Sequence, residues 1–160
     1  MHADPQFYTF RGTVKELERR LASVVTQGFD DCGTVIGRFK LLDSFDALTT
    51  RPAIADELET KHADLVSSYA EDLRAAVRQF HEQKDEPPIP RNLPPIAGKL
   101  TWCRGILERI QQPMNKMRSL GRAVLERDDA REVVKEFTSA LGVLADFEQT
   151  QHKEWDCRER

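Results

Sequence analysis

The sequence lacks the features that would place the chain in a membrane, on a secretory route or on nucleic acid. No apolar run approaches the roughly 20 residues that a membrane-spanning helix needs, and the polar residues 1–6 are not a signal peptide. Basic residues (24) and acidic residues (27) are interspersed, so the net charge of −3 comes without a polybasic block. We therefore expect neither membrane nor nucleic acid among its partners.

Cysteine is scarce, and its spacing excludes the usual metal and disulfide frameworks. The three cysteines, Cys32, Cys103 and Cys157, are an odd number and form neither a CxxC pair nor a zinc-like pattern. We interpret them as reduced thiols in a cytosolic type of compartment, in preference to a disulfide.

The motifs of nucleotide-dependent and hydrolytic enzymes are also missing. The phosphate-binding pattern GxxxxGK[ST] does not occur, nor do GxSxG, HExxH and GxGxxG. One ExxH pair, Glu59 and His62, has the spacing of bundle metal sites, but such a site needs a second copy and two further glutamates. His62 also lies in an apolar stripe, so we interpret it as a core or boundary histidine. We find no candidate catalytic, cofactor-binding or metal-ligating residue, and expect no enzyme activity and no cofactor.

What the sequence does contain is a proline-rich stretch at residues 85–98, which holds five of the eight prolines. Proline lacks a backbone donor and disfavours the helical conformation of the residue before it, so we expect no helix in this stretch. An extended, partly polyproline II connector would set the spacing of two helical halves. Ile89, Leu93 and Ile96 predict that the connector packs along the helices.

The remainder reads as long helices, so the predicted fold class is all-α, an elongated bundle of long antiparallel helices. Thr13 is the candidate N-cap of the first helix, with Glu16 completing a capping box. The expected organisation is an N-terminal extension (1–12), a first helical half (13–84, helices about 13–48 and 53–84), the connector (85–98) and a second helical half (99–160, helices about 99–125 and 129–153). Because the last helix is followed by no closing element, we expect a fragment of a longer chain.

The first predicted helix carries an apolar seam with the spacing of a heptad repeat. Its members recur at intervals of three and four residues, with one extra step of four that favours a gently curving helix: Val14, Leu17, Leu21, Val24, Gly28, Cys32, Val35, Phe39 and Leu42. Val25, Phe29, Ile36 and Phe45 widen this stripe, which predicts packing against more than one neighbouring helix.

Three glycines, at 28, 33 and 37, interrupt that helix, and each costs roughly 1 kcal/mol relative to alanine. One explanation is the close approach of another helix over Gly33 and Gly37. The other is a break between Gly28 and Gly33, after which Asp30 and Asp31 would cap a second piece.

The ends of the later helices are indicated by capping residues and prolines. Thr50 or Arg51 is the expected cap before Pro52, and the charged face of that helix, which includes Arg74 and Arg78, is expected to be solvated. Pro113 lies inside the third helix, where it would end the helix after Gln112 or bend it by more than about 20°. The fourth helix is expected to be capped by Asp128 and Asp129.

Trp102, Arg104 and Arg109 form the candidate contact for a partner, because tryptophan and arginine dominate interface hot spots. Trp102 also has a structural interpretation, in which it closes the proline connector against the helices. We favour the structural interpretation for Trp102.

Two runs of residues resemble the N-terminal tail of dynein heavy chains. Residues 29–45, FDDCGTVIGRFKLLDSF, resemble the helix that precedes the proline turn of that tail. Residues 87–102, PPIPRNLPPIAGKLTW, followed by RGILERI at 104–110 and Pro113-Met114, resemble the axonemal heavy chains in particular. The resemblance covers roughly residues 14–125, and the second run is specific.

The resemblance implies a stack of helical bundles in the dynein stem, without the ATP-hydrolysing ring or the microtubule-binding stalk. It implies a structural and assembly role with dynein heavy chains, intermediate chains and light-intermediate chains as partners, and with microtubules reached only through the full complex. The implied location is cytoplasmic and cytoskeletal, specifically the axoneme of a cilium or flagellum. An unrelated helical adaptor that binds a partner helix is the second interpretation, and a bundle metalloenzyme is the third.

Overall fold

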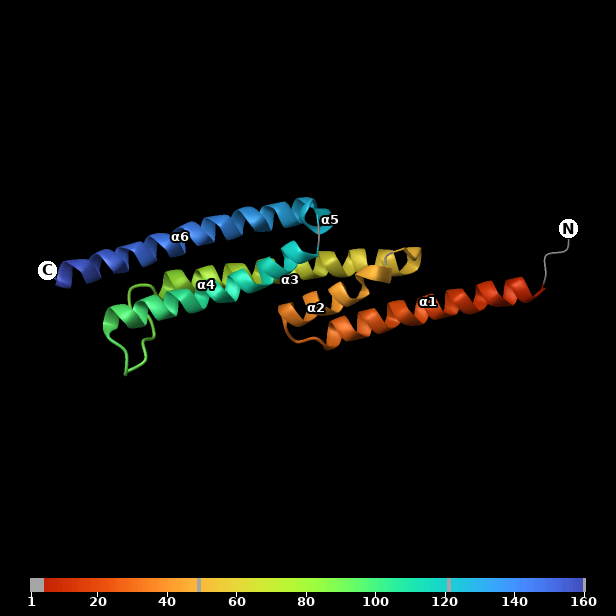
Figure 1. Cartoon of the computed structure of the whole chain (residues 1–160), viewed down its shortest axis with the longest axis horizontal. Coiled ribbons are helices and arrows are strands. Elements are labelled where there is room, and N and C mark those ends of the chain that lie inside the picture. Colours follow the sequence, from red (N-terminus) through yellow and green to blue (C-terminus); the bar gives the residue numbers. More distant parts are fainter. Residues whose placement is uncertain (1–4, 49, 121, 160) are drawn as a thin grey trace. The chain divides into compact units, whose positions relative to one another are not determined.

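The computed structural model describes residues 5–48, 50–120 and 122–159, and over these ranges it contains helices and no strand. The prediction of an all-α fold is therefore confirmed. The elements are α1 (Pro5–Asp31), α2 (Val35–Phe45), the short 3-10 helix η1 (Asp46–Leu48), α3 (Pro52–Gln83), α4 (Pro95–Ser119), α5 (Arg122–Leu125) and α6 (Asp128–Glu159) (Figure 1). Within the described ranges, none of these helices combines the length and the apolar character needed to cross a bilayer.

The chain divides into two compact units, residues 1–65 and residues 66–160. The boundary falls inside α3, so the first part of this helix belongs to unit 1 and the second part to unit 2. The boundary predicted from the sequence, between the two helical halves, lies instead at the proline-rich connector. The grouping of the chain into two helical halves around that connector stays a prediction.

In unit 1, α1 and α2 form a helical hairpin with a break between Asp31 and Val35. This decides between the two explanations of the glycines in favour of a break. The cap of α2 is Thr34, whose hydroxyl accepts a hydrogen bond of 3.1 Å from the backbone nitrogen of Gly37. The expectation that Asp30 and Asp31 would cap this helix was wrong, because both residues belong to the last turn of α1 and lie before the break. Close approach occurs at Gly28, where an added Cβ would lie 3.2 Å from Leu41.

The first helix begins at Pro5, so the expected start at Thr13 was wrong. Proline suits the first turn of a helix because its missing N–H has no partner there in any case. Thr13 lies inside α1, and its hydroxyl donates to the carbonyl of Thr9 at 3.0 Å instead of capping. Glu16 accepts from Arg19 and Arg20. Residues 5–12 of the expected extension are therefore helical.

The buried face of α1 is the one that contacts the first part of α3. Glu18 pairs with Arg51 at 3.5 Å, Thr26 hydrogen-bonds Glu57, and Asp30 lies 3.9 Å from Lys61. In these three pairs the residue numbers increase along both helices in the same order, so α1 and the first part of α3 run parallel. Val25 and Phe29 fill this face.

The connector is shorter than expected, because α4 begins at Pro95. The expectation that all five prolines exclude helix was wrong for Pro95, which takes the first helical position after Pro94. The backbone nitrogen of Gly98 then donates to the carbonyl of Pro94 at 2.8 Å. Ile96 is buried and Ile89 packs on Gly98, so the connector does pack on the helices as predicted.

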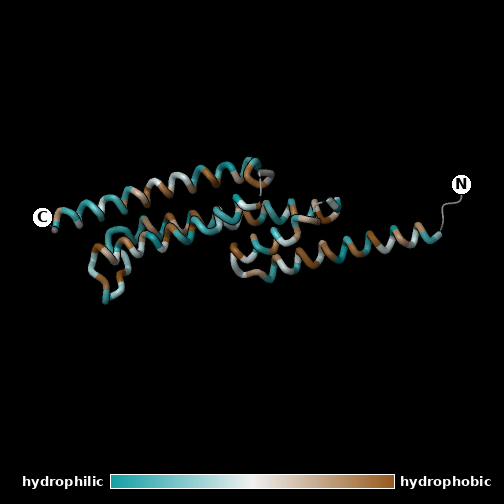
Figure 2. Tube along the Cα trace, in the orientation of Figure 1, coloured by the Kyte–Doolittle hydropathy of each residue, from teal (hydrophilic) through white to brown (hydrophobic). Residues whose placement is uncertain are grey.

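Unit 2 is built from three long helices, which are α4, α6 and the second part of α3, together with the short α5. Cys103 and Arg118 of α4 contact Leu144 and Phe137 of α6, so the numbering falls along α6 as it rises along α4 and the two helices are antiparallel. The predicted apolar stripes are buried on all three helices, and their largest fully buried side chains include Tyr69, Leu73, Ile110, Met114, Met117 and Phe137. Hydrophobic positions recur along each of these helices in Figure 2.

The ends of the later helices also differ from expectation. The stretch predicted as one helix over about 99–125 is α4 and α5, with α4 ending at Ser119. The last helix begins at Asp128 and continues to Glu159, beyond the predicted end near 153. Terminal residues of amphipathic helices carry little apolar periodicity, which is why the pattern underestimates this length.

Pro113 lies inside α4 without ending it, so the alternative that the helix stops after Gln112 was wrong. The predicted bend stays a prediction. Because proline has no N–H, the carbonyl of Arg109, four residues earlier, loses its helical donor. The hydroxyl of Tyr69 donates to the next carbonyl of this turn, that of Ile110, at 2.7 Å. Burial raises the pKa of Tyr69 well above its usual range, so the hydroxyl keeps its proton.

Tyr69→Phe is expected to lower the free energy of unfolding by about 1 kcal/mol, because the carbonyl of Ile110 loses a buried donor. Urea unfolding followed by circular dichroism measures the change. Tyr8→Phe is the matched control, since Tyr8 is 62% exposed and should change stability little. Equal unfolding midpoints for the two variants would contradict a role of this hydroxyl in supporting α4.

Candidate interaction surface

Trp102 lies among aromatic side chains from all three helices of unit 2. Its ring stacks on Phe80 of α3 at 5.6 Å between centroids, and meets the edge of Phe147 of α6 at 5.9 Å. Phe80 and Phe147 meet each other at 5.3 Å. Aromatic pairs in such geometries add stability beyond the area they bury. These contacts support the structural interpretation of Trp102, as the centre of an aromatic cluster formed by Phe80, Trp102 and Phe147.

Hydrogen bonding by the indole nitrogen does not explain why Trp102 lies in this cluster. Its indole nitrogen is buried and has no hydrogen-bond partner among the described residues, and the same holds for the side-chain oxygen of Gln151. A buried donor without an acceptor is unfavourable. Trp102 is therefore held by ring packing and not by a hydrogen bond.

Arg104 and Arg109, the other two candidate contact residues, are exposed and reach different helices. The Arg104 Nε donates to Glu148 Oε1 of α6 at 2.9 Å, and the Arg109 Nη1 donates to Gln79 Oε1 of α3 at 3.1 Å. The structure thus brings Arg104 and Trp102 to the same turn of α6, while Arg109 lies over α3. Their contact with a partner stays a prediction.

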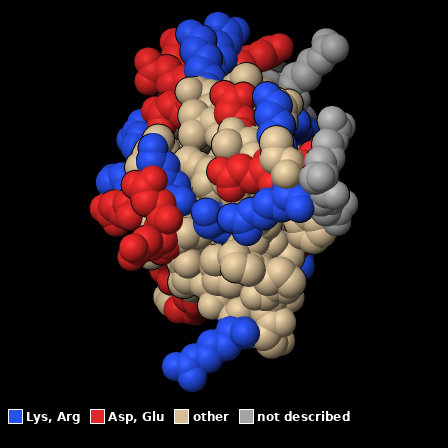
Figure 3. Space-filling view, turned by 90° about the vertical axis from the view of Figure 1, so that its left-hand side faces the viewer, with Lys and Arg blue, Asp and Glu red and all other residues tan. Residues whose placement is uncertain are grey.

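One face of the molecule, shown in Figure 3, carries charges of both signs. Lys and Arg side chains are interspersed with Asp and Glu on the face shown in Figure 3, and its lower part is largely uncharged. Exposed ion pairs of this kind contribute little to stability, typically about 0 to 1 kcal/mol each. Apolar surface, and not these charges, would therefore supply most of the free energy for binding a partner.

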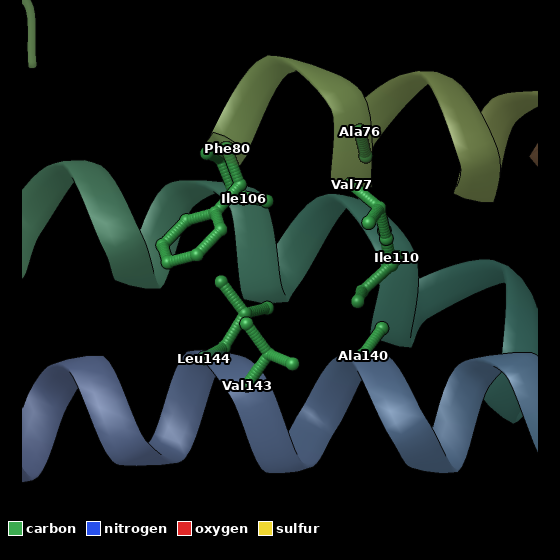
Figure 4. Close-up of a pocket in the computed structure, with 8 residues that line it drawn as sticks. All are labelled: Ala76, Val77, Phe80, Ile106, Ile110, Ala140, Val143 and Leu144. Carbon is green, nitrogen blue, oxygen red and sulfur yellow. The ribbon is translucent and has the colours of Figure 1, made fainter. Parts of the chain in front are cut away.

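A groove between α3 and α6 of unit 2 supplies such a surface, and sequence analysis missed it. It has a volume of about 450 Å³ and is lined by Leu73, Arg74, Val77, Arg78, His81, Glu136, Ser139, Ala140 and Val143. In Figure 4, Val77 of α3 faces Ala140 and Val143 of α6. A smaller cavity of about 10 Å³ adjoins these residues and is closed by Phe80, Ile106 and Leu144. We call the larger space the α3–α6 groove.

The charged side chains of the α3–α6 groove are unequally paired. Arg74 and Glu136 form a bidentate pair at 2.9 and 2.7 Å. The hydrogen bonds from Arg74 hold the pKa of Glu136 below its usual range and raise the pKa of Arg74 in turn. Arg78 and His81 have no carboxylate partner among the described residues. Arg74 and Arg78 are exposed, as predicted for a solvated face, and they also line the groove.

Unit 1 has an exposed apolar face on α1. The predicted seam is not buried at Leu17, Leu21 and Val24, which are 53%, 37% and 57% exposed. Phe10 and Phe7, about two and three turns before Leu17, are also exposed. The predicted seam is therefore buried at Phe39 and Leu42 but not along α1, which is buried at Val25 and Phe29 of the predicted wider stripe. Faces this apolar commonly mark interaction sites.

The isolated ExxH pair gains no further ligand in the structure. Glu59 is exposed and His62 is half-buried on α3. Across the described ranges, no group of three or more histidine, cysteine, aspartate or glutamate side chains is arranged to hold a metal ion.

All three cysteines are free thiols, with Cys157 exposed and Cys103 buried between α4 and α6. The Cys103 thiol donates to the carbonyl of Leu144 at 3.6 Å, and burial raises its pKa from 9.0 to about 11. The fold therefore favours the protonated thiol.

We expect the stabilising contribution of Cys103 to be complete below pH 9 and to be lost as the pH rises through about 11. The folded protein then has to bury a thiolate or expose the site. Urea unfolding at several alkaline pH values should show a steeper loss for the wild type than for Cys103→Ala. The same slope for both proteins would contradict this assignment.

Comparison with known proteins identifies the chain. The model of the family "Dynein heavy chain, N-terminal region 1" matches residues 4–159. The chain belongs to this dynein heavy chain family. It is 46% identical over 134 residues, 84% of its length, to the beta chain of the flagellar outer arm dynein of Chlamydomonas reinhardtii. It is 30% identical over 152 residues to the gamma chain of the same alga, and 29% identical over 152 residues to human dynein axonemal heavy chain 8.

The chain spans about 3% of the length of these three relatives, while they cover 84% to 95% of the chain. The resemblance to dynein heavy chains is thus confirmed over almost the whole sequence. Membership of the family decides against the interpretations as an unrelated adaptor or a bundle metalloenzyme.

Proposed function

We propose that this chain is a non-catalytic segment of the tail of an axonemal dynein heavy chain, acting as a structural and assembly module of a microtubule motor. The observation that carries the proposal is the match of the N-terminal family model to residues 4–159, together with 46% identity to a flagellar outer arm beta chain. The absence of a GxxxxGK[ST] motif is consistent with a segment outside the ATPase ring.

The proposed location is the axoneme of a cilium or flagellum, because the relatives are named as flagellar outer arm and axonemal chains. The proposed partners are dynein heavy chains, intermediate chains and light-intermediate chains. Contact with microtubules would be indirect, through the complete complex.

The helices suit such a role mechanically. The two longest, α3 and α6, have 32 residues each, and a helix of that length spans about 48 Å at about 1.5 Å per residue. Packed helices move as rigid bodies, since their interiors deform little. A segment of this kind can hold binding surfaces at fixed spacing and transmit displacement between them.

The test is recovery of dynein subunits from a ciliary extract by the tagged 160-residue chain, with identification by mass spectrometry. We expect intermediate chains or heavy chains to be recovered. Arg104→Ala with Arg109→Ala tests the candidate contact, and Lys153→Ala is a control on exposed surface. Loss in the double variant but not in the control would place a partner near these arginines.

Circular dichroism establishes whether each protein is folded before the recovery experiment. A folded wild-type chain that recovers no dynein subunit would contradict the assembly role of this segment. Equal recovery by all three proteins would support assembly while excluding the two arginines as the contact.

A further inference from the structure

We infer that the α3–α6 groove of unit 2 binds an amphipathic helix whose apolar stripe is flanked by aspartate or glutamate. The inference rests on the proposed assembly role and specifies the kind of partner that this part of the tail would bind.

The shape of the groove fits a helix better than a small molecule. Its lining residues run from Leu73 to His81 on α3 and from Glu136 to Val143 on α6. At about 1.5 Å per residue, these stretches extend roughly 10 to 12 Å along the helices, or about two helical turns. Recognition of a helix in a groove uses anchors spaced three and four residues apart over such a length.

Two valines on the floor of the groove supply apolar surface that the bundle leaves uncovered. Val77 is half-buried and Val143 is 37% exposed, whereas Leu73 and Ala140 beneath them are buried. Figure 4 places Val77, Ala140 and Val143 on the facing sides of α3 and α6. Burial of apolar surface contributes about 25 cal/mol per Å², so a leucine or isoleucine stripe laid over these residues would provide the main binding energy.

The charges at the edge decide which helix fits. Of the four ionisable side chains that line the groove, Arg74 and Glu136 neutralise each other, and Arg78 and His81 remain. Both belong to α3, so the basic edge lies on one side of the floor. A partner helix with carboxylates beside its apolar stripe would pair with Arg78 and place a hydrogen-bond acceptor beside His81. A helix with lysine flanks would face like charge, which disfavours binding.

The experiment measures binding of two designed helical peptides to the 160-residue chain by fluorescence anisotropy. Both peptides carry the same leucine stripe, and they differ in having glutamate or lysine beside it. We expect the glutamate-flanked peptide to bind at least about tenfold more tightly than the lysine-flanked one at low salt.

Two variants locate the site. Val143→Glu places a charge on the floor and should weaken binding of the glutamate-flanked peptide by about tenfold or more. Its control is Ala145→Glu, on the same helix and outside the groove lining. Arg78→Glu reverses the charge at the edge of the groove, so the lysine-flanked peptide should then bind more tightly than the glutamate-flanked one. Lys153→Glu makes the same charge change elsewhere on the surface and should leave the preference unchanged.

Exchange of the preference by Arg78→Glu with unchanged binding by the two controls supports the inference. Equal affinity for both peptides, or binding unaffected by Val143→Glu, would overturn it. These outcomes are separate from those of the ciliary-extract experiment, because recovery of dynein subunits without binding of either peptide leaves the tail assignment standing and removes only the groove.

Discussion

Trp102→Ala is expected to lower the free energy of unfolding of the chain by about 3 kcal/mol, the lower end of the range for removal of a large aromatic side chain. Trp102 is half-buried, stacks on Phe80 and meets the edge of Phe147. Its removal would take away the contacts that join α4 to α3 and α6 at this level of unit 2. Chemical unfolding followed by circular dichroism measures the loss.

Two controls separate packing from the other properties of Trp102. Trp102→Phe keeps an aromatic ring and loses an indole nitrogen that has no partner among the described residues, so we expect a cost below about 1.5 kcal/mol. Arg104→Ala removes an exposed ion pair with Glu148 and should cost less than about 1 kcal/mol.

A Trp102→Ala variant with wild-type stability would contradict the structural role. If that variant stayed folded and failed to recover dynein subunits, the interpretation of Trp102 as a partner contact would gain support instead. The stability measurement therefore has to precede any binding experiment with this residue.

Gly98→Ala is expected to lower the free energy of unfolding by about 1 to 3 kcal/mol, although alanine is the better helix former. An added Cβ would lie 3.1 Å from the Cβ of Ile89 and would overlap its Cγ2 methyl group. Isoleucine is branched at Cβ and has few alternative rotamers, so it cannot move aside cheaply. Either the connector or the first turn of α4 would have to shift.

Gly105→Ala on the same helix is the matched control for Gly98→Ala. An added Cβ at Gly105 meets no described atom within 4 Å, so the helix propensity of alanine should raise the stability by up to about 1 kcal/mol. Opposite signs for the two substitutions are the expected result in thermal or urea unfolding. A stabilising effect at both positions would mean that the connector does not pack on α4 as described.

Much of unit 2 could be predicted from sequence because its helices present one apolar stripe each. The stripe through Tyr69 and Leu73 of α3 and the stripe through Ile106, Ile110 and Met114 of α4 are both buried as expected. A single stripe leaves one way to bury a helix. The proline-rich run at 87–102 also indicated the family, and the N-terminal family model confirms it.

The candidate site was less accessible to prediction. Trp102, Arg104 and Arg109 were chosen by residue type, and the structure places the first in an aromatic cluster and the other two over different helices. The α3–α6 groove was missed because Arg74 and Arg78 look like an ordinary solvated face. A signal was present in Val143, an apolar residue next to the Leu144 of the stripe, but its exposure follows only from the packing of α6.

By itself, the sequence determined that this chain is helical, where its proline connector lies, which faces of α3 and α4 are buried, and to which family it belongs. Local propensity and periodicity are enough for the first three properties, and the family follows from the residue run at 87–102. Tertiary structure decided which of two neighbouring apolar faces of α1 is buried, because Val25 and Phe29 are buried, with Arg38 of α2 and Lys61 of α3 over the Phe29 ring, while Leu17 and Val24 are exposed. It also decided where a groove remains open, since a groove is defined by two helices that the chain brings together only on folding.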